Sequence, residues 1–311
     1  DFRPPAPRAE EGRTKPAGRH PPVFTMGYNH QHYGTAGFFY LHTVPGILAW
    51  DRFSVLKSRH SCRERSINMD NWLARTRLLL GDEAVNSLRH SRVAVLGLGG
   101  VGGAAAEAIC RSGVGAMLLA DYDKVDITNL NRQLIAVTST VGHDKTEAAA
   151  RRLRDINPEL DLTLREGRLT SENLPEVLDW QPDYILDCID NVTAKLALTV
   201  LCRERGIRLI TCLGTGNRLD PSLLRVGNLP DTAGTGCPLS RIMRKELRRR
   251  GITDLTVVYS LEVPVEPAGV PATDNGRHPP ASMAFVPPAA GFLMASYAVR
   301  DLLGLLPPAG R

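Results

Sequence analysis

The chain has 311 residues, of which 43% are hydrophobic and 5% aromatic, and a formal net charge of +5. This length is enough for one large domain with a buried core. Residues 1–68 hold ten of the 38 Lys and Arg residues but only five of the 33 Asp and Glu residues, so the rest of the chain is neutral. The overall charge is therefore no argument that the protein binds nucleic acid.

Cysteine spacing and hydropathy argue against disulfides, a zinc site and a membrane span. The six cysteines are scattered, without a C-x-x-C pair, and several lie in apolar runs where cysteine packs as a small hydrophobe. The longest apolar candidate, Gly37–Trp50, contains His42 and Pro45 and is shorter than the roughly 18 residues of a transmembrane helix. We therefore expect a protein of the reducing cytoplasm without a membrane segment.

The first 68 residues differ in composition from the domain that follows. They are rich in Pro, Arg and His, lack a sustained periodicity, and are followed by Met69, which directly precedes the first regular pattern. They do not have the charged start and apolar core of a signal peptide. We interpret residues 1–68 as translated upstream sequence or a disordered arm, and residues 69–311 as the folded domain.

Strand and helix patterns alternate from Met69 onward. The expected strands are Arg92–Leu96, Ala116–Ala120, Leu160–Leu164, Tyr184–Cys188, Arg208–Thr211 and Leu255–Ser260. The expected helices are Trp72–Leu88, Ala104–Arg111, Lys145–Asp155, Ser171–Leu178, Val192–Arg205, a basic helix at 240–250 and Ala289–Leu306, with loops at Leu229–Pro238 and Pro264–Ala281. Such alternation predicts an α/β fold with a doubly wound, mostly parallel, Rossmann-like sheet covered on both faces, and further strands and helices near the C-terminus.

A glycine-rich turn follows the first expected strand and opens a helix. In this G-x-G-G-x-G run, Gly97 suits a tight turn, Gly99 a close approach of backbone to phosphate, and Gly102 close helix–sheet packing. With Gly100, the helix start supplies N–H groups and a positive dipole for an anion. Asp121, which ends the next strand, can accept hydrogen bonds from ribose hydroxyls. This fingerprint alone does not separate a dinucleotide from ATP.

Cationic and amide side chains after Asp121 favour a triphosphate. Arg132 can donate two hydrogen bonds to phosphate oxygens, and Asn129 can donate to them as well. Lys145 begins a helix and is a plausible second phosphate contact. Asp190 lies just past an expected strand, at the carboxyl edge of the sheet, where it could hold magnesium on the triphosphate.

In order and spacing, these motifs resemble those of the ubiquitin-activating-type (ThiF/MoeB-like) adenylating enzymes. The resemblance covers about Arg75 to Leu306 and includes D-x-D with N-x-N-R-Q, V-G-x-x-K and D-x-x-D-N besides the glycine turn. It implies that the chain binds ATP and Mg²⁺, with Asp190 on the metal. The nucleotide residues that it implies are Gly97, Gly99, Gly100, Gly102, Asp121, Asp123, Asn129, Arg132, Gln133, Lys145 and Asp190.

The resemblance also implies a homodimer and three catalytic residues, Arg75, Arg132 and Asp190. The second Arg of the family's leading R-x-x-R motif falls on Arg75, which is implied to reach the phosphates of the partner subunit. Trp72 stands in place of the first Arg, and this departure puts the role of Arg75 across the dimer in question.

Within the family, later segments resemble the bacterial tRNA threonylcarbamoyladenosine dehydratases. This resemblance implies that the carboxylate of a threonylcarbamoyl group, on an adenosine next to the anticodon of tRNA, is adenylated. The neighbouring carbamoyl oxygen then closes a ring and releases AMP. The sequence leaves open whether a sulfur-transfer or electron-transfer accessory protein takes part. The runs that carry the resemblance are 111–115, 214–221, 237–247, 258–260 and 282–287.

The basic helix offers a candidate surface for RNA. Arg241, Arg244, Lys245 and Arg248 recur at helical spacing and share one face. An apolar side is offered by Leu239, Ile242, Met243 and Leu247. Such a face could follow tRNA phosphates, although a solvated surface would have the same pattern. No aromatic side chain interleaves it, so base stacking is not expected.

Cys237 precedes the basic helix in a region where thioester-forming relatives carry a reactive cysteine. Because the cyclisation needs no thiol, we expect Cys237 to pack or to anchor the loop. A catalytic role stays open.

Three other functions compete with this one. An activator of a ubiquitin-like sulfur-carrier protein would share the ATP site, although many such enzymes carry two C-x-x-C pairs that this chain lacks. An NAD-linked oxidoreductase would leave Arg132 and Lys145 without a role. A subunit that only binds a partner would be expected to have lost its phosphate-binding residues.

Overall fold

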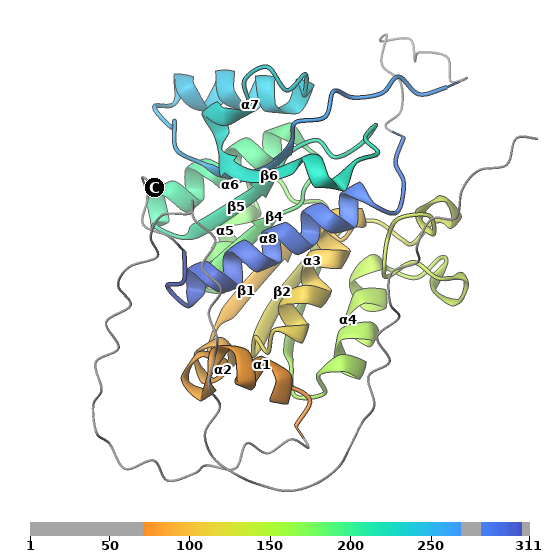
Figure 1. Cartoon of the computed structure of the whole chain (residues 1–311), viewed down its shortest axis with the longest axis vertical. Coiled ribbons are helices and arrows are strands. Elements are labelled where there is room, and N and C mark those ends of the chain that lie inside the picture. The colour runs from red at the N-terminus through yellow and green to blue at the C-terminus, as the bar shows by residue number, and fades with distance from the viewer. Residues whose placement is uncertain (1–70, 269–280, 307–311) are drawn as a thin grey trace, which may run out of the picture. The chain divides into compact units, whose positions relative to one another are not determined.

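The computed structural model describes residues 71–268 and 281–306 (Figure 1). The expected extension at residues 1–68 lies outside the described residues, as does most of the expected loop Pro264–Ala281. The boundary between extension and domain therefore stays a prediction. Within the described ranges, no helix is both long enough and apolar enough to cross a membrane.

A seven-stranded sheet forms the centre of the fold, in the order β3-β2-β1-β4-β5-β7-β6. All neighbouring strands are parallel except β6 and β7. The α/β, mostly parallel class predicted from the sequence is confirmed. The strands are β1 (Arg92–Leu96), β2 (Ala116–Asp121), β3 (Asp161–Glu166), β4 (Tyr184–Asp187), β5 (Arg208–Cys212), β6 (Leu224–Asn228) and β7 (Thr256–Ser260).

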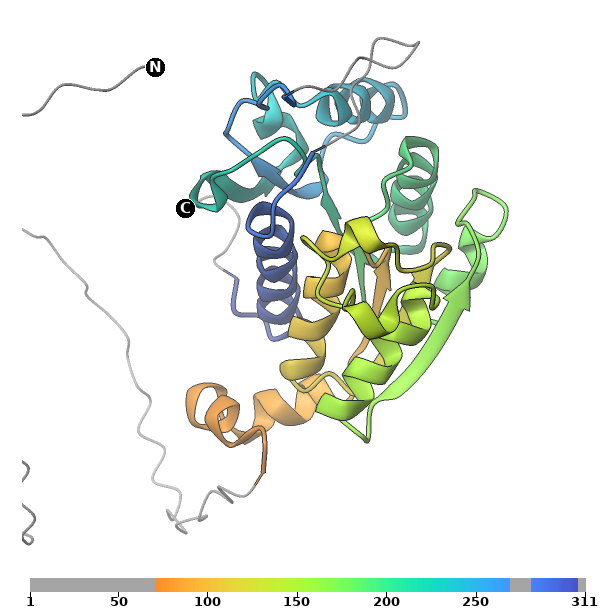
Figure 2. The same ribbon diagram turned by 90° about the vertical axis from the view of Figure 1, so that its right-hand side faces the viewer.

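Helices cover both faces of this sheet, because alternate strand residues point to opposite sides. Val93 and Val95 of β1 belong to the hydrophobic cluster that contains α3, α4 and α8, whereas Ala94 and Leu96 pack with α5 and α6. Figure 2 shows α8 alongside α3. The helices are α1 (Ala74–Leu80), α2 (Asp82–Arg89), α3 (Gly100–Arg111), α4 (Lys145–Ile156), α5 (Leu174–Asp179), α6 (Val192–Arg205), α7 (Pro238–Arg249) and α8 (Val286–Leu302).

Four of the expected helices were wrong in extent. The helix α3 begins at Gly100 rather than Ala104, and α5 begins at Leu174 rather than Ser171. The single helix expected over Trp72–Leu88 is two helices, because Gly81 adopts a φ of 85°, which a right-handed helix cannot contain. The last helix begins at Val286 rather than Ala289, since prolines fit the first turn, where a backbone N–H has no helical partner. It ends at Leu302, short of the expected Leu306.

The strand order places a crevice where nucleotide-binding sheets bind their ligands. The chain runs from β1 outward through β2 and β3, and then returns to β4 on the other side of β1. Ligands of open α/β sheets bind at the carboxyl ends of the strands that flank such a reversal. The glycine turn after β1 and the turn after β4 meet at this point.

Candidate functional site

A cavity of about 270 Å³ lies at the carboxyl ends of β1, β2 and β4. It brings together residues that are far apart in the sequence, as the expected parallel sheet requires. Ten of the residues predicted to contact a nucleotide line it: Gly97, Gly99, Gly100, Asp121, Asp123, Asn129, Arg132, Gln133, Lys145 and Asp190.

Each glycine of the turn has a different structural role. Gly97 has a φ of 88°, and a Cβ there would lie 2.6 Å from the Cys188 carbonyl oxygen. A Cβ on Gly102 would lie 1.7 Å from the Gly97 carbonyl oxygen, so Gly102 packs against the turn and does not line the cavity. At Gly99 the nearest atom to a Cβ is Gln133 Nε2 at 4.0 Å. The surface of Gly99 is therefore open to a ligand.

Replacing Gly102 by alanine is expected to lower the free energy of unfolding by about 1–3 kcal/mol, because the new methyl group overlaps backbone. Gly103→Ala is the matched control: its Cβ would make only ordinary contacts, at 3.5 Å and beyond, in the same helix. Alanine there should be neutral or stabilising by up to about 1 kcal/mol. Urea titration of both variants measures the difference, and equal stabilities would contradict this account of the turn.

Asp121 and Asp123 organise the side of the cavity next to β2. Asp121 Oδ2 accepts the Leu98 N–H at 2.5 Å, and its Oδ1 accepts the Asp123 N–H at 2.9 Å. Asp121 thus fixes the glycine turn, a role that the sequence did not indicate. The ribose contact expected from the sequence stays a prediction. Lys145 is buried at the start of α4, and its Nζ donates to Asp123 Oδ2 at 2.8 Å. A phosphate near Lys145 would share the ammonium with Asp123.

Arg132 and Gln133 line the cavity from the segment that follows β2. Arg132 Nη1 donates to the Thr128 carbonyl at 3.0 Å and to Asn131 Oδ1 at 2.9 Å, which holds the guanidinium at the cavity edge. Gln133 is buried, and its Oε1 has no hydrogen-bond partner in the described parts of the chain. Because a buried unpaired acceptor is costly, this oxygen suits a ligand that donates a hydrogen bond.

Asp190 lies on the turn after β4, which hydrogen bonds and an ion pair of Asp187 stabilise. Asp187, at the end of β4, accepts the Ile189 N–H through Oδ1 at 3.0 Å. Its Oδ2 lies 3.0 Å from Lys195 Nζ and accepts the Thr211 hydroxyl at 3.1 Å, and both members of the Asp187–Lys195 pair are fully buried. This network leaves Asp190 exposed at the cavity.

No group of three or more His, Cys, Asp or Glu side chains suited to a metal occurs among the described residues. A cation at Asp190 would therefore take its other ligands from water and substrate phosphates. Mg²⁺ is commonly bound in this way, through one or two carboxylates, so the residues present fit it.

Sequence reasoning missed one part of the cavity wall. The Arg168 guanidinium lies 4.9 Å from the centroid of the Tyr122 ring, and with Leu169 these side chains line the cavity beyond Asp121. Arg168 follows β3 at the same sheet edge as Asp190. The rule that selected Asp190, a polar residue just past a parallel strand, could have found it.

Arg75 does not lie in this cavity. It is exposed on α1, which packs at the amino ends of the strands: a Cβ on Gly113, just before β2, would lie 2.9 Å from Leu73 Cδ1. Figure 1 shows α1 and α2 at that end of β1 and β2. The expected contact of Arg75 with a partner's phosphates stays a prediction.

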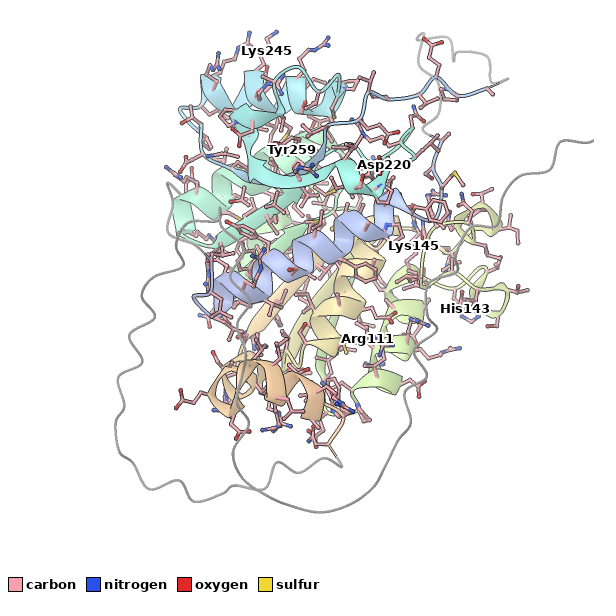
Figure 3. The ribbon with its side chains drawn as sticks, viewed as in Figure 1. Arg111, His143, Lys145, Asp220, Lys245 and Tyr259 are labelled. Atoms are coloured by element: carbon pink, nitrogen blue, oxygen red, sulfur yellow. The ribbon has the colours of Figure 1, made fainter. Side chains whose placement is uncertain are left out.

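The basic face of α7 is exposed except at Arg244. Arg241, Lys245 and Arg248 are exposed, and Figure 3 shows Lys245 on the outer side of the helix. Arg244 is half-buried and donates to the hydroxyls of Thr232 and Ser240. The Arg244 guanidinium therefore uses some of its hydrogen-bond donors within the protein, including one to the loop before α7. Of the expected apolar side, Met243 and Leu247 are buried, whereas Ile242 is 38% exposed.

The cysteines near the cavity have the environment of packed thiols. Cys237 is buried, and its Sγ accepts the Ser240 N–H at 3.5 Å at the start of α7. Burial raises the pKa of the Cys212 thiol to about 12, and burial also raises the pKa of Cys188 well above its ordinary value. The thiols of Cys188 and Cys212 therefore stay protonated, and unreactive, at neutral pH.

The fold and the cavity define a nucleotide-binding α/β protein, and residues 73–310 match the model of the ThiF family. The chain belongs to the ThiF family, as its motifs predicted. It is 39% identical over 240 residues to the tRNA threonylcarbamoyladenosine dehydratase of Bacillus subtilis, covering 74% of this chain and 94% of the relative.

A solved structure and a second relative extend the comparison. The structure of the Escherichia coli tRNA N6-threonylcarbamoyladenosine dehydratase in complex with ATP aligns with a TM-score of 0.67 at 32% identity, covering 75% of this chain and 93% of that one. The sulfur carrier protein ThiS adenylyltransferase of Escherichia coli is 35% identical over 142 residues, 45% of this chain and 56% of the relative.

Proposed function

We propose that this protein is an ATP-dependent tRNA threonylcarbamoyladenosine dehydratase that adenylates the carboxylate of its substrate. One observation carries the proposal: a single cavity, at the reversal of the strand order, combines the glycine turn, Arg132, Lys145 and Asp190. The similarity to the Bacillus subtilis enzyme over nearly its full length supports the choice of substrate. The sulfur-carrier activator aligns over a smaller part of this chain and is the weaker alternative.

In the first step, a carboxylate oxygen of the substrate forms a bond to the α-phosphorus of ATP. The bond between the α- and β-phosphates breaks, and pyrophosphate leaves. Arg132 and the N–H groups at the start of α3 would stabilise the charge that develops on the α-phosphate. Asp190 would hold a magnesium ion that neutralises part of the triphosphate charge. Gln133, Asp121 and Tyr122 would orient the nucleoside.

In the second step, the carbamoyl group of the same substituent attacks the activated carboxyl carbon. The new bond closes a ring, the bond to AMP breaks with its electron pair on AMP, and a nitrogen proton passes to solvent. Attack within one molecule lowers the barrier by up to about 7–11 kcal/mol at the best geometry. No protein nucleophile is needed, which agrees with the buried position of Cys237.

The remaining parts of the proposal concern partners. The exposed cations of α7 would contact tRNA phosphates, with Arg244 serving the loop as well as the RNA. We also propose a homodimer, to which Arg75 contributes, and action in the cytoplasm, where tRNA is available. A sulfur- or electron-transfer accessory protein is compatible with this scheme but not required by it.

Neutralising Lys245 and Arg248 together, each to glutamine, is expected to weaken tRNA binding and to lower the salt dependence of the affinity. The slope of log K against log salt should fall by about two, one for each lost phosphate contact. Both side chains are exposed, so the fold and ATP binding should be unaffected. The matched control is Arg151→Gln with Arg154→Gln, exposed on α4. Equal slopes in both double variants would remove α7 from the interface.

ATP–pyrophosphate exchange tests the proposed function. The full chain, ATP and magnesium should exchange pyrophosphate only when tRNA carrying threonylcarbamoyladenosine is added. The same tRNA with unmodified adenosine is the control. Exchange that instead requires a ubiquitin-like sulfur-carrier protein would favour the alternative.

A further inference from the structure

A second cavity, of about 310 Å³, adjoins the nucleotide cavity. The two share a border. The remaining wall of the second cavity comes from two segments, residues 212–216 and residues 281–287, together with Val101 and with Leu239 at the start of α7. The border consists of Gly99, Gly100, Arg132, Cys188, Ile189 and Asp190. A group in the second cavity can therefore face the phosphates bound in the first across Arg132 and the glycine turn.

Asn217 joins the two segments of this wall. Its backbone N–H donates to the Ala281 carbonyl at 2.7 Å, and the Ala281 N–H donates back to Asn217 Oδ1 at 2.6 Å. Asn217 has a φ of 59°, a left-handed conformation that glycine, asparagine and aspartate tolerate best. On the other side, Asn131 Nδ2 donates to the Ser282 carbonyl at 2.9 Å. Ala281 and Ser282 are thus held between Asn217 and Asn131, the neighbour of Arg132.

Away from the border, the second cavity is uncharged and is lined mainly by apolar residues and glycines. Among its described lining residues, the charged ones are Arg132 and Asp190, both on the border. The hydroxyl-bearing residues Thr215 and Ser282 and the apolar Leu239 make up part of the rest. Such a cavity suits a small, uncharged and partly apolar group that can hydrogen-bond to a hydroxyl and carries one carboxylate toward Arg132. Leu239 lies on α7, so the cavity opens beside the helix that bears the exposed cations.

We propose that this second cavity, the acceptor cavity, receives the N6-threonylcarbamoyl substituent of the adenosine, with its carboxylate at the border. Asn217 is a positioning residue that holds the wall on which the substituent rests. The proposal depends on the proposed function, because that function supplies the substrate. The group to be activated then lies beside Arg132, and the phosphate chain of the RNA continues toward α7.

Two substitutions at Asn217 distinguish the effect of its side-chain hydrogen bond from the effect of its backbone conformation. Asn217→Gly keeps the left-handed backbone and removes the acceptor for the Ala281 N–H, whereas Asn217→Asp retains an acceptor oxygen. Asn217→Gly should raise the KM for modified tRNA by about tenfold, as expected for one lost hydrogen bond. The dissociation constant of ATP should stay unchanged, and Asn217→Asp should return the KM to within about threefold of the wild type.

A substitution that fills the acceptor cavity, with a matched control outside it, tests whether the cavity binds the substituent. Thr215→Phe should block turnover of modified tRNA while preserving the affinity for ATP and for unmodified tRNA. Leu219→Phe is the control, since Leu219 is exposed on the same loop and outside the cavity.

The outcomes distinguish the two proposals. A wild-type chain without activity on modified tRNA would overturn the proposed function. An active wild type whose KM is unchanged in Asn217→Gly and Thr215→Phe would overturn the acceptor cavity alone. Loss of ATP affinity in Asn217→Gly would make Asn217 a general structural residue and overturn its positioning role. If Asn217→Gly and Thr215→Phe impaired activity on a sulfur-carrier protein but left tRNA turnover intact, the acceptor cavity would not bind the threonylcarbamoyl substituent.

Discussion

Replacement of Arg132 by alanine is expected to lower the rate of pyrophosphate exchange by about 10²–10³-fold while leaving the fold intact. Arg132 lies on the border of both cavities, where the attacking carboxylate and the α-phosphate would meet. Its hydrogen bonds to Thr128 and Asn131 involve exposed loop atoms, so their loss should change the free energy of unfolding by about 1 kcal/mol or less.

Arg132→Lys is the informative companion variant. Lysine retains the positive charge but cannot donate the two parallel hydrogen bonds of a guanidinium, so an intermediate rate is expected. Exchange assays under saturating ATP, with a thermal melt of each variant, make the measurement. A rate for Arg132→Ala within about threefold of the wild type would contradict a role in stabilising the transition state.

Replacement of Lys195 by methionine is expected to lower the free energy of unfolding by about 3–5 kcal/mol. Lys195 and Asp187 form an ion pair at 3.0 Å with side chains 1% and 0% exposed. Removing the ammonium leaves a buried carboxylate with only the Thr211 hydroxyl and the Ile189 N–H as donors. The same carboxylate holds the turn that carries Asp190, so ATP affinity should fall as well.

An exposed ion pair on the same helix provides the control. Arg203 pairs with Asp254 at 2.6 Å, but both side chains are 57% exposed, so Arg203→Met should change stability by about 1 kcal/mol or less. The double variant Asp187→Asn with Lys195→Met should regain much of the lost stability, since no buried charge is left unpaired. Urea midpoints at constant m value report these differences. A cost for Lys195→Met no greater than that for Arg203→Met would refute the account.

The sheet and the polar residues at its carboxyl edge could be predicted because both depend on local patterns. Apolar runs separated by helical periodicity define a parallel sheet, and the residue after each strand must then lie at one edge. This reasoning brought Asp121 and Asp190 to one cavity. Arg168 obeys the same rule after β3, but it was overlooked because no motif marked it.

Features that depend on tertiary packing could not be predicted. Nothing local indicates that Lys195 on α6 reaches back to Asp187, because the contact depends on how α6 crosses β4. Helical spacing places Arg244 on the same face as the other cations. It does not indicate that Arg244 donates a hydrogen bond to the Thr232 hydroxyl. The break at Gly81 was missed because glycine inside a helix costs only about 1 kcal/mol relative to alanine, so the pattern alone allowed the helix to continue.

The mass of the modified nucleoside tests the central claim most directly. The full chain is incubated with ATP, magnesium and tRNA carrying threonylcarbamoyladenosine, and the nucleosides are weighed after digestion, with Arg132→Ala and ATP-free reactions as controls. We predict that the modified nucleoside loses one water and that one AMP forms for each nucleoside converted. An unchanged nucleoside, with tRNA intact and ATP present, would contradict the account.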